Sequence, residues 1–273
     1  MSRTLTRSPF VAVLTLGLAT SAPVRLAVRR VLSRGARWIL RLRSRPYPIE
    51  QDTTALVLAP HEDDETLGCG GLLFLKRIEG TPVHVAYITD GAASHPGHPS
   101  FPPHAVATQR QAEARRAMKL LGVEQAGLRF LGARDGTLAN LDSAIAAELV
   151  GRIAAVLEQV RPDEIFLPCR RDGSSEHEAA FGLVARALEQ SGLRPRILEF
   201  PVWSWWNPLL LIRPLAASRR IWRVSFRGYA QTKREAIAAH ASQTQPVPPD
   251  SQPVLSPAFV AFFSSDEEFF FER

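Results

Sequence analysis

The alternation of short apolar runs with longer helical segments is the feature that most limits how this chain can fold. The continuous apolar run at 55–59 is typical of a strand buried on both faces, and 164–168 is predicted to be another buried strand. Segments with helical spacing follow them, at 66–78 and 176–190. Strands connected through helices run parallel, so the sequence predicts an α/β fold whose mostly parallel sheet is covered by helices on both faces.

Further alternating segments extend this pattern toward the C-terminus. The sequence predicts strands at 83–89, 128–131, 196–202 and 222–226, and helices at 105–121, 141–160 and 230–241. The tail from Pro246 onward is rich in proline and then aromatic and acidic, without a clear period. In parallel sheets, functional sites lie beyond the carboxyl ends of the strands, so the polar residues that follow each predicted strand are the candidates.

Length and cysteine content exclude several classes of protein. The chain has 273 residues, of which 45% are hydrophobic, enough to bury one substantial core. Its two cysteines, Cys69 and Cys169, form no CxxC pair. This argues against a disulfide-stabilised secreted domain and against a cysteine-based zinc site, and both thiols are predicted to be buried and reduced.

The basic charge is confined to the N-terminal arm. The net charge is +6, but residues 1–50 contain ten arginines and one acid, Glu50, so the remaining 223 residues are mildly acidic at −3. Nucleic-acid-binding proteins usually spread basic residues over a folded face, so the sequence predicts no nucleic-acid partner.

The arm itself allows two interpretations. Its apolar segment 10–19 is too short to span a bilayer and resembles the core of a signal peptide, although the arginine-rich stretch that follows is unusual after a cleavage site. Residues 24–42 alternate arginines with apolar residues at helical spacing. Such a helix either lies on an anionic membrane surface or packs on its own domain. The sequence predicts a cytoplasmic protein and leaves open a peripheral membrane contact through residues 1–45.

The stretch LVLAPHEDDETLGCGG at 56–71 combines a strand end, a histidine, four acids and three glycines. A phosphate-binding loop would need a lysine after its glycines, and a dinucleotide fingerprint would need them directly after the strand. Neither condition holds. Gly68, Gly70 and Gly71 fall within the predicted helix, where they permit close packing on the sheet.

The polar half of this stretch predicts a metal site. His61 and Asp64 are three residues apart at a strand-to-helix turn and can converge on one point. Helix capping explains one or two acids, but not a histidine followed by four, which would repel one another without a cation. Asp63 could accept a proton from a metal-bound water. The best third ligand is His177, which follows the strand at 164–168, with Asp172 and Glu176 close by.

These residues resemble a known family. APHEDDETLGCGG is similar to the (P/A)-H-P-D-D-E…G-G motif of the PIG-L/LmbE-like zinc-dependent N-acetylglucosaminyl deacetylases. The resemblance extends over roughly 55–243, through the fragments TQRQAEARRAMKLLG, LGARDGTL, DGSSEH and KREAIAAHASQ. It implies an LmbE-like fold, a Rossmann-like three-layer sandwich with a mostly parallel sheet. The basic helical arm precedes that fold.

The resemblance also implies an activity and its residues. Zn²⁺ would be held by His61, Asp64 and His177, with Asp63 as the general base and a zinc-bound water as the nucleophile. Arg110 and Asp135 match positions that touch the sugar. The implied enzyme hydrolyses a linear amide C–N bond and removes the acetyl group from an N-acetylated amino sugar or glycoconjugate.

Three positions depart from the family pattern. Glu62 replaces a proline, Glu176 replaces an aspartate, and Ser174 stands where the family has a histidine that assists the intermediate or the leaving amine. Serine cannot carry a positive charge at neutral pH. His240 is the first candidate to serve in its place, although a histidine packed against its own domain is the alternative.

The expected organisation has three parts: a basic amphipathic arm at 1–50, a catalytic domain at 51–245, and a tail at 246–273 that packs on or extends the domain. Two other functions stay open, a zinc hydrolase of another amide and a non-catalytic sugar-binding relative. Iron(II) would fit the same ligands. The aromatic stretch PVWSWWNPLLL at 201–211 lines a sugar groove or belongs to the core.

Overall fold

The structure, a computed structural model, describes residues 22–273, so the apolar segment 10–19 lies outside the described part. Within residues 22–273, eight strands form one sheet in the order β1-β7-β8-β6-β5-β2-β3-β4. The strands are β1 (Arg45–Pro46), β2 (Ala55–Ala59), β3 (Val83–Thr89), β4 (Leu128–Ala133), β5 (Glu164–Pro168), β6 (Arg196–Phe200), β7 (Arg220–Ser225) and β8 (Glu267–Glu272).

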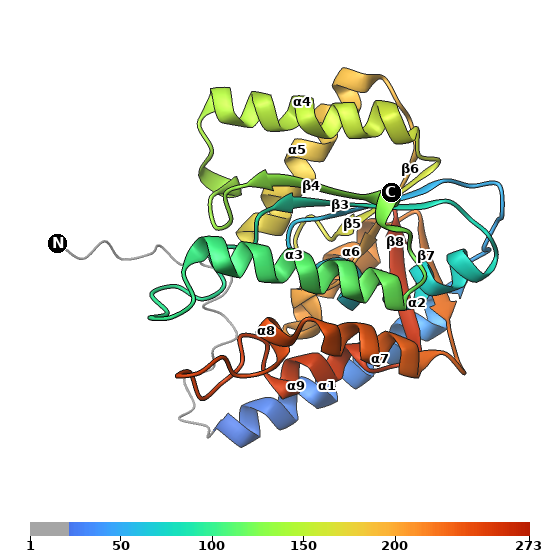
Figure 1. Ribbon diagram of the computed structural model, residues 1–273. Coiled ribbons are helices and arrows are strands. Elements are labelled where there is room, and N and C mark those ends of the chain that lie inside the picture. The colour runs from blue at the N-terminus through green and yellow to red at the C-terminus, as the bar shows by residue number, and fades with distance from the viewer. Residues whose placement is uncertain (1–21) are drawn as a thin grey trace.

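Helices cover both faces of this sheet (Figure 1). On one face lie α4 (Ser143–Val160) and α5 (Ser175–Ser191), and their apolar residues form one of two core clusters. The other cluster lies under the opposite layer, α1 (Ala22–Arg43), α2 (Asp64–Ile78), α3 (Pro103–Leu120) and α7 (Ala230–Ala239). The predicted three-layer α/β sandwich is confirmed.

The short helices are α6 (Ile212–Ala217), α8 (Ala241–Thr244), α9 (Pro257–Val260), η1 (Gln125–Gly127), η2 (Leu138–Asn140), η3 (Trp203–Trp205), η4 (Pro208–Leu211) and η5 (Ala261–Phe263).

The C-terminal strand β8 is, with the two-residue strand β1, one of two strands that the sequence pattern did not predict. It lies between β6 and β7 and pairs antiparallel with both, whereas the other neighbouring strands are parallel. Phe269, Phe270 and Phe271 are all buried, because the strand is covered on both faces. Its apolar run, Phe269 to Phe271, is only three residues long and is flanked by glutamates, which is shorter than the run of four or more that marks a buried strand.

The strand order places a topological switch point beside β2. The chain runs from β2 outward to β3 and β4, and then returns to the other side of β2 with β5 and β6. Loops that leave β2 and β5 therefore diverge and open a crevice at the carboxyl ends of these strands, which is where open α/β sheets bind ligands.

The glycines of α2 bring this helix close to the sheet. A Cβ added to Gly68 would lie 2.0 Å from Cδ2 of Phe200, and one added to Gly71 would lie 2.1 Å from Cδ1 of Phe226. No side chain fits at either position, so the helix approaches the sheet at backbone distance. The structure supports the packing interpretation of these glycines over a phosphate loop.

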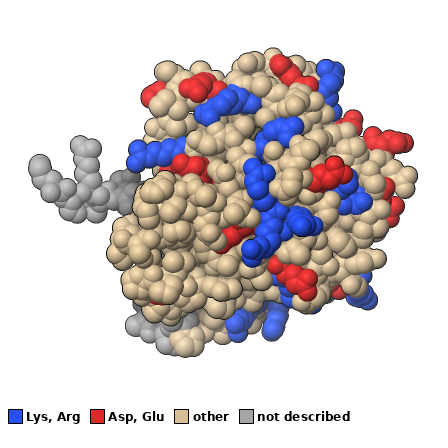
Figure 2. Space-filling model, in the orientation of Figure 1, with Lys and Arg blue, Asp and Glu red and all other residues tan. Residues whose placement is uncertain are grey.

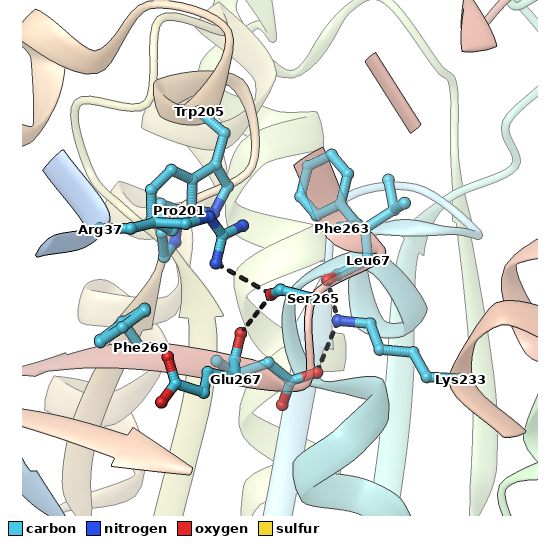
Figure 3. A pocket seen from close by; sticks show the side chains of 11 residues that line it. Arg37, Leu67, Pro201, Trp205, Lys233, Phe263, Ser265, Glu267 and Phe269 are labelled. Carbon is cyan, nitrogen blue, oxygen red and sulfur yellow. Dashed lines mark hydrogen bonds and ion pairs between the residues drawn. The ribbon is translucent and has the colours of Figure 1, made fainter. Parts of the chain in front are cut away.

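The helix α1 packs on the body through one face. Leu40 is completely buried, Ser33 Oγ donates to the carbonyl of Trp205 at 2.9 Å, and the Arg37 guanidinium lies 4.1 Å over the Trp205 ring. Figure 3 shows Arg37 directed at Ser265, to which it donates at 2.9 Å. The space beside these side chains, about 10 Å³, could hold at most one water and is no ligand site.

Among the described helices, none is long and apolar enough to cross a bilayer. The division into an arm at 1–50, a catalytic domain at 51–245 and a tail at 246–273 stays a prediction. The contacts of α1 and the position of β8 nevertheless tie residues from the first and third segments to the sheet.

Candidate active site

The first two predicted ligands lie in the turn between β2 and α2. His61 Nδ1 is 3.2 Å from Asp64 Oδ2, and the same carboxylate oxygen accepts a hydrogen bond from the backbone N–H of His61 at 3.1 Å. Asp63 is the residue before α2, and its side chain caps no backbone group of this helix. The aspartates are therefore not used as helix caps, which was the alternative to a metal site.

The third predicted ligand reaches the same point from the neighbouring strand. His177 lies in the first turn of α5, after β5, and its Nε2 is 3.3 Å from Asp64 Oδ2. Its other ring nitrogen, Nδ1, is 2.8 Å from Asp172 Oδ2, and both side chains are completely buried. Asp172 also accepts hydrogen bonds from the backbone N–H groups of Val202, Trp203 and Ser204.

This arrangement holds His177 in one tautomer. Because the Asp172 carboxylate can only accept, His177 Nδ1 carries a proton, and Nε2, which faces Asp64, is the nitrogen available to a metal ion. Nε2 is buried and has no hydrogen-bond partner among the described residues. A carboxylate behind a histidine is the usual support of a metal ligand.

The donor atoms of His61, Asp64 and His177 fit a metal ion. All three lie within 4.8 Å of one another. At Zn–N and Zn–O distances of about 2.1 Å, tetrahedral donors stand about 3.4 Å apart. The two separations from Asp64 Oδ2, 3.2 Å and 3.3 Å, are close to that value. Two imidazoles and one carboxylate form the ligand set of a catalytic zinc site with an open fourth position.

Asp135 lies behind His61. Its Oδ1 is 3.2 Å from His61 Nε2, and its Oδ2 accepts from the backbone N–H of Ala93 at 2.9 Å. Burial alone would lower the pKa of His61, but hydrogen bonds to Asp135 and Asp64 raise it to about 10. The surroundings of His61 therefore favour a positive charge. Glu176 lies close enough to form a second group with His61 and Asp135, and its Oε1 accepts from Leu138.

Asp63 and Arg110 form a buried ion pair beside the three donors. Arg110 Nη2 is 3.3 Å from Asp63 Oδ1, and its Nε is 3.5 Å from Glu62 Oε2. Burial raises the pKa of Asp63, an effect that the charge of Arg110 opposes. Burial likewise raises the pKa of Glu62, to about 7. Glu62, which replaces the family's proline, thus contacts Arg110 rather than the metal ligands.

His240 lies outside the cleft wall and is 1% exposed. Its Nε2 is 3.1 Å from Thr66 Oγ1, and that hydroxyl is 2.7 Å from Glu65 Oε1, so the three side chains form one buried hydrogen-bond chain. Burial and the nearby Arg110 lower the pKa of His240 to about 3. A neutral, enclosed imidazole has no proton to give near pH 7. The predicted catalytic role of His240 therefore stays a prediction that its position does not favour.

A cleft of about 560 Å³ opens onto these residues. Its polar wall includes His61, Asp63, Asp64, Arg110, Asp135 and Ser174. Most of its apolar wall comes from residues 202–259, where the tilted rings of Trp203 and Phe259 have centroids 4.7 Å apart. Of the aromatic stretch 201–211, Trp203 thus lines the cleft while Trp205 is buried in the core.

The structure also explains motifs whose contacts the sequence did not indicate. Glu113, at the centre of α3, accepts from the backbone N–H of Ser242 at 2.8 Å and from its hydroxyl at 2.7 Å. Gln243, next along the chain, lines the cleft. Glu113 therefore holds the segment around Ser242 against helix α3, which also carries Arg110. No local signal in the sequence joins residues 129 positions apart.

Comparison with known proteins now bears on this site. The profile of the PIG-L family, described as GlcNAc-PI de-N-acetylase, matches residues 56–188, which include all three donors and Asp63. Residues 56–188 of this chain thus resemble the PIG-L family. A curated relative, the "Probable N-acetyl-alpha-D-glucosaminyl L-malate deacetylase 2" of Bacillus subtilis, is 29% identical over 195 residues, or 70% of this chain and 83% of the relative.

Solved structures share the fold of this chain. The N,N'-diacetylchitobiose deacetylase from Pyrococcus horikoshii superimposes with a TM-score of 0.56 at 20% identity, covering 79% of each chain. The 4-carboxy-2-hydroxymuconate hydratase GalB from Pseudomonas putida superimposes with a TM-score of 0.58 at 18% identity, over 78% of this chain and 83% of GalB. Because GalB is a hydratase and the Pyrococcus protein a deacetylase, the fold alone does not decide the reaction.

Proposed function

We propose that this protein is a zinc-dependent deacetylase that hydrolyses the amide bond of an N-acetylated amino sugar or glycoconjugate. One observation carries the proposal: Asp64 Oδ2 lies 3.2 Å and 3.3 Å from the donor nitrogens of two histidines, beside a carboxylate on the cleft wall. The names of the curated relative and of the Pyrococcus enzyme support an acetylated amino sugar as substrate.

His61, Asp64 and His177 would hold the metal. When bound, Zn²⁺ would polarise the amide carbonyl and lower the pKa of a water molecule. Asp172 supports this site by keeping the Nε2 lone pair of His177 directed inward. Asp135 contacts His61 Nε2, which leaves His61 Nδ1, beside Asp64, for the metal. We therefore assign Asp135 to ligand support in addition to the sugar contact that the resemblance implies.

Asp63 is the proposed general base. Its carboxylate lies on the cleft wall, one residue from a ligand, where it can take the proton of the attacking water and pass it to the leaving amine. Arg110 opposes the rise in the pKa of Asp63 that burial causes, and so favours the charged carboxylate. Arg110 also lines the cleft and can donate to a sugar hydroxyl or carbonyl.

Ser174 favours one alternative, a sugar-binding protein without turnover. It lies on the cleft wall in place of the family's histidine and caps α5, where its Oγ accepts from the backbone N–H of His177. A hydroxyl can donate a hydrogen bond to a developing oxyanion but supplies no positive charge. A zinc hydrolase of a different amide is the other alternative.

The test measures zinc content and amine release from a panel of N-acetylglucosamine derivatives. We expect one bound metal and measurable turnover, with Asp63→Asn lowering kcat by about 10³-fold while zinc is retained. Asp142→Asn is the matched control, because Asp142 caps α4 outside the cleft and asparagine caps equally well. Bound zinc without turnover on any derivative would favour the sugar-binding alternative, whereas turnover only on non-sugar amides would favour the other hydrolase. The predicted cytoplasmic location stays a prediction.

A further inference from the structure

The outer side of α1 is apolar. Its packed side is a narrow stripe of residues three or four positions apart: Leu26, Arg29, Ser33, Arg37 and Leu40. The large apolar residues outside this stripe are exposed, with Val31 at 64%, Trp38 at 63% and Leu42 at 66%. At about 100° per residue, these three fall within about 40° of one another and nearly opposite Leu40. Val24, Val28, Leu32 and Ile39 extend the same outer face and are 41–52% exposed.

Arginines border this outer face on both sides. By the same helical spacing, Arg30 and Arg34 follow one edge together with Arg41, which is paired with Glu267, while Arg25 and Arg43 follow the other. The helix has seven arginines and no acidic residue in its 22 positions. Lys and Arg side chains mark the lower edge of the molecule in Figure 2, along which α1 runs in Figure 1.

We propose that the outer face of α1 binds the surface of a bilayer that contains anionic lipids, with the helix lying in the plane of the interface. Apolar side chains enter the boundary between headgroups and acyl chains, and arginines at the two borders reach the phosphate groups. An apolar stripe flanked by basic residues matches this environment in both hydrophobicity and charge.

Charge argues against a second copy of this chain as the occupant. Two α1 helices packed face to face would bring their arginine borders together, and α1 offers no acidic residue to compensate them. Anionic lipid headgroups supply the missing negative charge. The proposal does not depend on the proposed deacetylase activity.

The helix also lies close to the cleft. The Arg29 guanidinium stands 4.3 Å over the Trp206 ring, and Trp206 lies 5.8 Å from Phe259 in the apolar wall of the cleft. One aromatic layer therefore separates the inner face of α1 from the cleft. Because a helix is about 10 Å across, a bilayer on the outer face would lie close beside the cleft wall.

Flotation of the full chain with vesicles tests the proposal. We expect binding to equal parts of phosphatidylcholine and phosphatidylglycerol, and little binding to phosphatidylcholine alone. The double variant Trp38→Ser/Leu42→Ser should bind at least tenfold more weakly. Ile145→Ser is the matched control, because Ile145 is 46% exposed on α4 in the opposite layer. It should bind like the unaltered chain.

A variant that removes two arginine charges measures the electrostatic contribution to vesicle binding. Arg30→Gln/Arg34→Gln should weaken binding about thirtyfold, since each basic residue near an anionic surface contributes about fivefold. Raising the salt to 1 M should weaken binding of the unaltered chain, because it shortens the Debye length to about 3 Å.

Equal binding of the unaltered chain and both α1 variants would overturn the proposal, since residues 1–21 or another surface would then carry the contact. Absence of binding to the anionic vesicles would also overturn it. Sedimentation velocity without lipid measures whether the chain instead forms a dimer through α1. A dimer that dissociates in Trp38→Ser/Leu42→Ser would show that a second copy covers this face. Hydrolysis of a soluble substrate by the α1 variants should stay unchanged, which separates this test from that of the proposed function.

Discussion

His177 Nδ1 lies 2.8 Å from Asp172 Oδ2, and neither side chain is exposed to solvent. Asp172 receives this N–H together with three backbone N–H groups and the hydroxyl of Ser204, all from residues 202–204. The same carboxylate therefore orients a proposed zinc ligand and fixes the turn that begins the aromatic wall of the cleft.

The substitution Asp172→Asn should weaken zinc binding by about 10- to 100-fold. The asparagine NH₂ group would face N–H donors, so the tautomer and orientation of His177 would no longer be held. Competition with a chromophoric chelator measures the affinity. The exposed Asp142→Asn serves as the control, and an affinity of Asp172→Asn within twofold of the unaltered chain would contradict this role.

Removal of the metal should lower the melting temperature. A ligand that binds only the folded state stabilises it by RT ln(1 + [L]/Kd), about 4 kcal/mol at a thousandfold excess over Kd. We expect chelation to lower Tm and added Zn²⁺ to restore it. His177→Ala should show no response to either treatment, because it lacks a donor. A full zinc response in that variant would refute the ligand assignment.

Loss of the Arg110 charge should raise the pKa of Asp63, because Arg110 is the group that opposes the effect of burial. In Arg110→Met the acidic limb of the kcat/KM profile should move to higher pH by about one unit or more. Arg110→Lys, which retains the charge, should move it much less. Glu62→Gln removes a neighbouring negative charge and should not move the acidic limb of the kcat/KM profile to higher pH. An unchanged limb in Arg110→Met would exclude Asp63 as the titrating base.

Stability should fall in acid because of His240. Its folded pKa is about 3, below the value of about 6.5 expected when unfolded, so the unfolded chain binds the proton more readily between these values. The free energy of unfolding should therefore decrease as pH falls from about 6.5 toward 3. In His240→Gln this decrease should be smaller, by up to about 1.4 kcal/mol for each pH unit crossed in that window. Urea unfolding at several pH values measures it, and parallel curves for the two proteins would contradict the assignment.

Gly68→Ala should destabilise the fold by about 1–3 kcal/mol, because the new Cβ would meet the Phe200 ring at 2.0 Å. Gly182→Ala in α5 is the matched control, since nothing lies within 4 Å of its added Cβ. It should stabilise the chain by up to about 1 kcal/mol, as expected for alanine in a helix. Equal effects of the two substitutions in urea unfolding would refute the packing argument.

Much of the fold was predictable because buried parallel strands and amphipathic helices leave local patterns. The apolar runs 55–59, 83–89 and 164–168 match β2, β3 and β5. Strand β8 has no such pattern, and its place between β6 and β7 depends on pairing with strands 40 or more residues away. Long-range pairing of this kind follows from the assembled sheet rather than from local periodicity.

The sequence by itself determined which chemical groups are available: a histidine and acids after one strand, and Asp172 and His177 after another. Only the tertiary structure decided that β5 lies beside β2, which brings His177 to 3.3 Å from Asp64 across 113 positions of the chain. It likewise directed Asp135 to His61 and enclosed His240 beside Thr66. The physical reason is that residue type and spacing set what a side chain can do, whereas its partners and pKa depend on groups that only folding brings close.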